Sequence, residues 1–249
     1  MRRQSSGVSF ILLTLFVCLS EATACAQTYI SVYTGTSYTQ ASNLRIRQQS
    51  TNTDATFRDV SWRARPFAQA PYYGIRFSRF FERSKHLGLS FDYTHYKIYA
   101  RTDRVVSVSG LWNGAVLNES ARLDSRVQDF NISHGVNMGG INLLYRWMKQ
   151  GGASFPEGRV QPYVGGGPVY YVPHSESTIN NRTTNGRYQG SGFGFQLLGG
   201  LQYNLARQFS LFAETKFNAG HATVDTADQG HADTNLRTFH TLAGFSFGF

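Results

Sequence analysis

The histidines and carboxylates of this sequence are the residues with the clearest capacity for chemistry. His174 and Glu176 are two positions apart, and alternate residues of a β-strand share a face, so their side chains can converge on one ion. A histidine from a neighbouring strand, either His95 or His134, would complete a set of two histidines and one carboxylate, which suits iron in oxygen chemistry. The spacing therefore predicts a divalent-metal site. The alternative is that these histidines only form hydrogen bonds within loops.

A serine nucleophile receives less support from the same residues. A serine hydrolase built on a barrel strand would need a His-x-Ser pair on one face, and this spacing does not occur in the chain. The adjacent pairs Ser133-His134 and His174-Ser175 would point to opposite faces of a strand. The sequence therefore disfavours esterase chemistry.

The start of the chain predicts export. Arg2 and Arg3 precede a short apolar run, and Ala24-Cys25-Ala26 provides the small-x-small pattern that signal peptidase cleaves. The run is too short for a membrane-spanning helix. We therefore predict a cleaved signal peptide over 1–26 and one domain over 27–249. The alternative is a lipoprotein anchored through Cys25.

Composition indicates a membrane surface as the partner of this domain. The chain carries a formal net charge of +9 and contains 14 Tyr and 19 Phe. Such a charge suits nucleic acid or a phosphate-bearing membrane, and export favours the membrane, so no nucleic-acid partner is expected. Both cysteines lie in the predicted signal peptide, so no disulfide is expected. No later window is apolar enough for a helix to cross a membrane, which leaves strands as the spanning element.

The last residues of the chain predict a transmembrane β-strand. Between Arg237 and Phe249, the side chains of Phe239, Phe245 and Phe247 share one face, and small or polar residues alternate with them on the other. Apolar-out, polar-in alternation is typical of outer-membrane barrels. A terminal strand that ends in Phe resembles the closing strand recognised by the outer-membrane assembly machinery, which we expect as a partner.

Seven further segments have strand character and bring the total to eight, the even number that a single-chain barrel needs. The sequence thus predicts an all-β fold: a transmembrane, antiparallel, up-and-down β-barrel of about eight strands, monomeric, in the outer membrane of a Gram-negative bacterium. The predicted strands are 28–35, 72–81, 87–100, 130–147, 159–172, 190–205, 209–220 and 237–249.

Connection lengths orient the barrel. Short turns at 82–86, 149–158 and 206–208 are expected to face the periplasm, and long loops to face the outside. The segment 36–71 is rich in polar residues and is interpreted as a solvated loop. The other long loops are expected at 101–129, 173–189 and 221–236.

In this orientation, five of the seven histidines lie at the outer rim: His95, His134, His174, His221 and His231. Lys97, Arg101 and Arg104 lie at the same rim, where cationic side chains could bind lipopolysaccharide phosphates. The alternative is that these charges only neutralise an anionic surface.

Strict alternation separates two of the candidate residues. Leu89, Phe91 and Tyr93 share a face with His95 and Lys97, so an apolar stripe on the lipid side would lead up to the head-group layer. Asp92 would instead point into the lumen. A bulge between Asp92 and His95 would be needed for both to bind one metal.

Four blocks of sequence together resemble the outer-membrane lipid A oxidase family, a group within the eight-stranded OmpA-type barrels. The resemblance spans most of the mature chain, although only these blocks are distinctive. They are Pro71-Tyr72-Tyr73-Gly74-Ile75-Arg76, the segment 89–97, His134-Gly135-Val136-Asn137, and the segment 161–167 leading to Pro173-His174-Ser175-Glu176.

The resemblance implies oxidation of the proximal glucosamine of lipid A to 2-aminogluconate, with molecular oxygen as co-substrate, a divalent metal ion such as iron as cofactor, and hydrogen peroxide as product. It supplies no catalytic assignment, so candidates follow from position and residue type. The catalytic candidates are Asp92, His95, Lys97, His134 and Asn137, and the metal ligands are His95, His134, His174 and Glu176. The alternative function is a non-catalytic barrel with a structural or surface-binding role.

Overall fold

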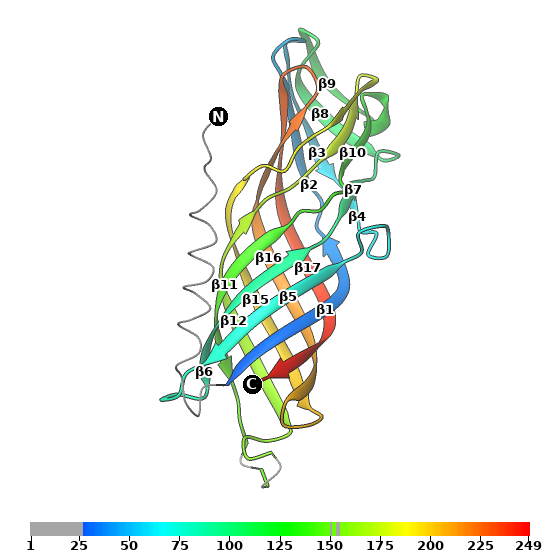
Figure 1. Cartoon of the computed structure of the whole chain (residues 1–249). Coiled ribbons are helices and arrows are strands. Elements are labelled where there is room, and N and C mark those ends of the chain that lie inside the picture. The colour runs from blue at the N-terminus through cyan, green and yellow to red at the C-terminus, as the bar shows by residue number, and fades with distance from the viewer. Residues whose placement is uncertain (1–26, 150, 153–154) are drawn as a thin grey trace, which may run out of the picture.

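A closed barrel of eight antiparallel strands forms the body of the molecule in the computed structural model, which describes residues 27–149, 151–152 and 155–249. The first and last strands close the ring by pairing Tyr29 with Gly248 through to Thr39 with Thr238. Neighbours in the ring are neighbours along the chain, which confirms the predicted up-and-down barrel (Figure 1). The strands are β1 Thr28–Thr39, β5 Tyr73–Phe80, β6 Leu87–His95, β11 Met138–Arg146, β12 Val160–Tyr171, β15 Gly192–Asn204, β16 Phe209–Thr226 and β17 Gly230–Gly248.

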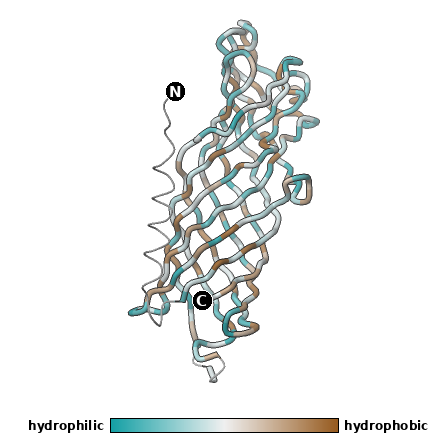
Figure 2. The backbone as a smooth tube through the Cα atoms, in the orientation of Figure 1, coloured by the Kyte–Doolittle hydropathy of each residue, from teal (hydrophilic) through white to brown (hydrophobic). Residues whose placement is uncertain are grey.

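The wall of the barrel has the predicted apolar exterior. In β17 the side chains of Phe239, Phe245 and Phe247 are exposed, whereas His240 and Leu242 between them are buried. Brown, hydrophobic segments recur along the barrel strands in Figure 2, and the tips of the upper hairpins are mostly hydrophilic. No helix of the described residues is long and apolar enough to cross a membrane. The predicted signal peptide, 1–26, lies outside the described residues.

A buried ion network fills the lumen. Arg76 donates to Glu214 Oε2 at 2.6 Å and to Asp92 Oδ2 at 2.8 Å, and Lys216 Nζ donates to the same Asp92 oxygen at 2.8 Å. The Tyr33 hydroxyl also donates to Asp92. Charges removed from water are tolerated only when they are paired in this way. The cavity beside this network, lined by Arg76, Tyr163 and Phe212, is only about 20 Å³, so side chains close the lumen at this level.

A second β-structure stands on the outer end of the barrel, and we call it the crown. The outer halves of β16 and β17 continue into a sheet with β2, β3, β8 and β9, which faces a five-stranded sheet (Figure 1). The crown strands are β2 Ser42–Gln48, β3 Thr53–Val60, β8 Val105–Trp112 and β9 Ala115–Arg122, and, in the smaller sheet, β4 Trp62–Arg63, β7 Ile98–Ala100, β10 Val127–Ile132, β13 Glu176–Ile179 and β14 Arg182–Asn185; a 3-10 turn, η1, covers Leu123–Ser125.

The prediction that 36–71 is a solvated loop and that the other long connections are plain loops was wrong, because these segments form the strands of the crown. Leu44 and Ile46 of β2 point into an apolar core shared with Phe57, whereas Arg45 and Arg47 point to solvent. Only two apolar residues alternate with the arginines of β2, and the segment 36–71 as a whole is rich in polar residues. Its composition therefore indicated a loop. The predicted strands 87–100 and 130–147 are also each divided between a barrel strand and a crown strand.

The end of the barrel away from the crown has the predicted short connections. Short connections join β5 to β6, β11 to β12 and β15 to β16, and the long connections all lie at the crown end. Phe249 lies at the end of the barrel away from the crown (Figure 1), where its backbone exchanges hydrogen bonds with Thr28.

Candidate functional site

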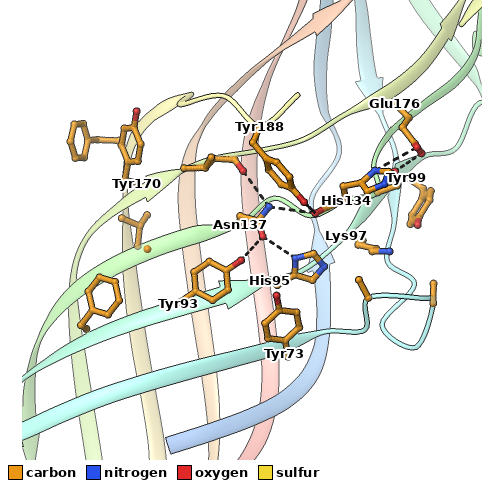
Figure 3. A pocket seen from close by; sticks show the side chains of 18 of the residues that line it. Tyr73, Tyr93, His95, Lys97, Tyr99, His134, Asn137, Tyr170, Glu176 and Tyr188 are labelled. Carbon is orange, nitrogen blue, oxygen red and sulfur yellow. Dashed lines mark hydrogen bonds and ion pairs between the residues drawn. The ribbon is translucent and has the colours of Figure 1, made fainter. Parts of the chain in front are cut away.

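A pocket of about 1100 Å³ lies on the outside of the barrel wall, where the wall meets the crown. Its lower lining consists of outward-facing side chains of four barrel strands: Phe91, Ile141, Tyr170 and Phe193, which are 56%, 58%, 40% and 76% exposed. Its upper lining is polar and comes from the connections between barrel and crown (Figure 3): His95, Lys97, His134, Asn137 and Glu176. The pocket is therefore amphipathic and opens toward the lipid side.

Asn137 organises the polar end of this pocket. Its Nδ2 donates to the backbone carbonyls of Gly135 at 3.1 Å and Val172 at 3.3 Å. That orientation directs Oδ1 to accept hydrogen bonds from the Tyr93 hydroxyl at 2.7 Å and from His95 Nδ1 at 2.9 Å. Because Nδ1 of His95 carries the proton, Nε2 keeps its lone pair, and this buried atom has no hydrogen-bond partner.

The turn between β10 and β11 makes this arrangement possible. Gly135 and Asn137 have φ values of 106° and 36°, in the left-handed region that glycine and asparagine tolerate best. A Cβ atom on Gly135 would lie 2.2 Å from Cε1 of His95. Tyr73 stacks on the imidazole of His95, with ring centroids 4.9 Å apart. The backbone of residues 134–137 therefore packs closely against the imidazole ring of His95.

A second polar cluster lies beside Asn137. His134 Nδ1 is 3.5 Å from Glu176 Oε1, and Ser133 Oγ donates to Glu176 Oε2 at 2.5 Å. The ring of His174 meets that of His134 edge to face at 4.4 Å. Nε2 of His174 donates to the Gly186 carbonyl, which leaves its buried Nδ1 without a partner. Ser133 and His134 both reach Glu176 because they lie in a turn and not, as expected, on a strand.

The structure brings three predicted metal ligands, His134, His174 and Glu176, into one cluster, with His95 on the same pocket wall. Among the residues that the structure describes, no group of three or more His, Cys, Asp or Glu side chains is placed to hold a metal ion. The metal site therefore stays a prediction.

Other predicted residues lie away from the pocket. Asp92 points into the lumen, as strict alternation predicts, and no bulge returns it to His95. Arg101 and Arg104 are exposed in the crown beyond β7 and do not line the pocket. His221 and His231 lie on the outer surface of the β16–β17 extension, within 3.4 Å and 3.0 Å of aspartates.

Lys97 is the one of the three predicted phosphate-binding cations that lines the pocket. It follows β6, and its Nζ donates to the carbonyl of Gln69. Partial burial lowers the pKa of Lys97, and the Glu176 carboxylate opposes that shift. The pocket thus has a cationic edge beside its polar end.

Of the aromatic residues that line the pocket, the predicted outward stripe included only Phe91 and Tyr93. Tyr170 and Phe193 occupy outward positions near the outer ends of their strands, where alternation alone marks them as lipid-facing. Tyr188 lies in a connection that was expected to be a plain loop. Its hydroxyl donates to the carbonyl of His134 at 3.3 Å, and its ring lies 4.7 Å from that of His174.

No protein-family model matches the chain, and no curated protein matches it. Solved structures do match. The outer membrane protein OprG from Pseudomonas aeruginosa is 15% identical, with 91% of this chain and 96% of that chain covered and a TM-score of 0.50. Neisserial surface protein A is 18% identical (91% and 100% covered, TM-score 0.43), and AlkL is 12% identical (100% and 97% covered, TM-score 0.46).

The likeness to OprG concerns the fold, and the apolar belt on the barrel wall is the feature by which such a fold sits in lipid. By its closed eight-stranded barrel and by this belt, the chain is a β-barrel protein of the Gram-negative outer membrane.

Proposed function

We propose that the protein is a lipid A-modifying enzyme that oxidises the proximal glucosamine of lipid A to 2-aminogluconate at the lateral pocket. The observation that carries this proposal is the pocket's position on the outside of the wall, with its apolar half on outward-facing barrel residues and its polar half at the junction with the crown. In a membrane, these halves would match the acyl chains and the head group of a lipid. A lipid of the outer leaflet could enter it sideways without leaving the membrane. The specific reaction comes from the sequence resemblance.

Recognition of the substrate is divided between the two halves of the pocket. Phe91, Ile141 and Phe193 offer apolar surface to acyl chains, and burial of such surface contributes about 25 cal/mol per Å². Lys97 offers a cation to an anionic head group. A substrate with both parts is retained better than a soluble sugar or a simple fatty acid.

The residues present meet only part of what the implied metal ion requires. The unpartnered Nδ1 of His174 suits a ligand role, because a carbonyl acceptor on the other ring nitrogen is the usual way to orient such a histidine. The described residues do not, however, converge as a three-ligand set. No step of the reaction is therefore assigned to a metal ion.

The proposed reaction determines which groups the pocket must supply. Oxidation of the sugar at C1 transfers two electrons and two protons to O2, giving hydrogen peroxide and a lactone, and hydrolysis of the lactone gives the aminogluconate. A base is needed to accept the hydroxyl proton. Nε2 of His95 suits this role, because Asn137 holds the proton on Nδ1 and leaves Nε2 as the acceptor.

The first test is mass spectrometry of 1-dephosphorylated lipid A incubated in air with the protein, with metal supplied or with chelator. We expect a gain of one oxygen atom, which chelator abolishes. His95→Gln removes the proposed base and is expected to lose the activity, whereas His221→Gln, a matched change in the crown outside the pocket, is expected to keep it. No mass change with metal supplied would favour the non-catalytic alternative, a structural or surface-binding barrel.

Substitution of Lys97 tests head-group binding. Lys97→Met removes the cation and keeps most of the side-chain volume, so the KM for the lipid is expected to rise roughly ten- to a hundredfold, the equivalent of about 1.5–3 kcal/mol for a hydrogen bond to a charged group. Arg101→Met, outside the pocket, is expected to leave KM unchanged. Equal effects of both substitutions would indicate general surface charge and not a specific contact.

A further inference from the structure

The connection between β4 and β5, residues 64–72, carries an aromatic side chain that is almost fully exposed. Phe67 is 87% exposed. In Figure 1 this connection projects sideways from the molecule at the level where barrel and crown meet. Burial of a Phe side chain contributes about 1.5–3 kcal/mol relative to exposure, so Phe67 would be stabilised by an apolar environment outside the protein.

The connection holds this exposed position by its own hydrogen bonds. The amide of Tyr72 donates to the carbonyl of Pro66 at 2.8 Å, and the amide of Ala68 donates to that of Arg65 at 3.2 Å. The guanidinium of Arg65 lies over the ring of Tyr99, 4.6 Å from its centroid. The segment is therefore a closed, braced turn that presents Phe67 at its tip.

The location of this turn points to lipid. It runs directly into β5, whose outward residues Tyr73 and Ile75 are 40% and 50% exposed and belong to the apolar belt. The exposed Arg63 and Arg65 precede Phe67, and an aromatic ring beside basic residues is typical of segments that lie at a membrane interface.

We infer that residues 64–72 form an interfacial lip, in which Phe67 inserts among the lipids of the outer leaflet. The lip borders the lateral pocket, because the next three residues, Ala68, Gln69 and Ala70, line it. Lys97 fastens the lip to the pocket rim through the Gln69 carbonyl. Insertion of Phe67 therefore holds one wall of the pocket at a constant depth in the leaflet. This contact does not depend on the reaction that the pocket performs.

Tryptophan fluorescence in brominated lipid measures the insertion. The full chain with Phe67→Trp is reconstituted in phosphatidylcholine vesicles whose acyl chains carry bromine near the head group or near the bilayer centre. The matched control is Val116→Trp, which replaces another exposed apolar side chain, 85% exposed, in β9 of the crown. The wild-type emission of Trp62, Trp112 and Trp147 is subtracted.

The added indole at position 67 is expected to emit at shorter wavelength and to lose about half of its intensity with shallow bromine, and less with deep bromine, as for a ring at the acyl–head-group boundary. The indole at position 116 is expected to be unquenched. If the position 67 indole were also unquenched at every depth, the lip would lie in water and the inference would be wrong.

Discussion

Gly135→Ala is expected to reduce lipid oxidation by about a hundredfold while the barrel stays folded. A Cβ atom at this position would lie 2.2 Å and 2.3 Å from two atoms of the His95 ring, so the ring must move. Displacement breaks the 2.9 Å hydrogen bond to Asn137 that sets the protonation of His95. A shift of about 1 Å in a catalytic group can cost this factor of a hundred.

Gly114→Ala is the matched control for that substitution. Gly114 also has a positive φ, 79°, so the alanine introduces similar backbone strain, but the nearest atom to its Cβ would be Nδ2 of Asn52 at 3.5 Å, an ordinary contact. This variant is expected to keep full activity. The comparison measures kcat by mass spectrometry and the folded fraction by urea unfolding. A fully active Gly135→Ala protein would remove His95 from the proposed mechanism.

Asp92→Asn is expected to lower the free energy of unfolding by about 3–5 kcal/mol, because it leaves the fully buried Lys216 without its counter-charge. The activity of each folded molecule is expected to stay unchanged, since Asp92 faces the lumen and not the pocket. Loss of activity in the folded fraction would instead return Asp92 to the catalytic candidates. Urea unfolding in vesicles, followed by the oxidation assay on the same samples, separates the two outcomes.

Two further variants test whether this loss of stability comes from burial of the ion pair. Asp54→Asn removes a salt bridge of similar length, 2.7 Å, that is about half exposed in the crown, so it is expected to cost no more than about 1 kcal/mol. The double variant Asp92→Asn, Lys216→Met removes both charges and is expected to recover much of the stability lost by the single change. If Asp54→Asn and Asp92→Asn lowered the free energy of unfolding by the same amount, burial of the ion pair would be unimportant for stability.

The barrel could be predicted from local patterns. Period-two alternation places Phe91 on the lipid face and Asp92 in the lumen, and the structure confirms both positions. The alternation of short turns with long connections was also predicted correctly. The crown was missed because the polar residues that face solvent on both of its sheets resemble those of loops.

The sequence by itself determined the fold class, the membrane face and the end of the barrel at which most histidines lie, because each depends on alternation and on order along the chain. Only the tertiary structure decided which residues form the pocket. Gly135 covers His95 from 40 positions away in the chain, and Glu176 of β13 reaches His134 in the turn between β10 and β11. Such contacts depend on how the crown folds down onto the barrel wall, and periodicity within one strand carries no information about packing between distant segments.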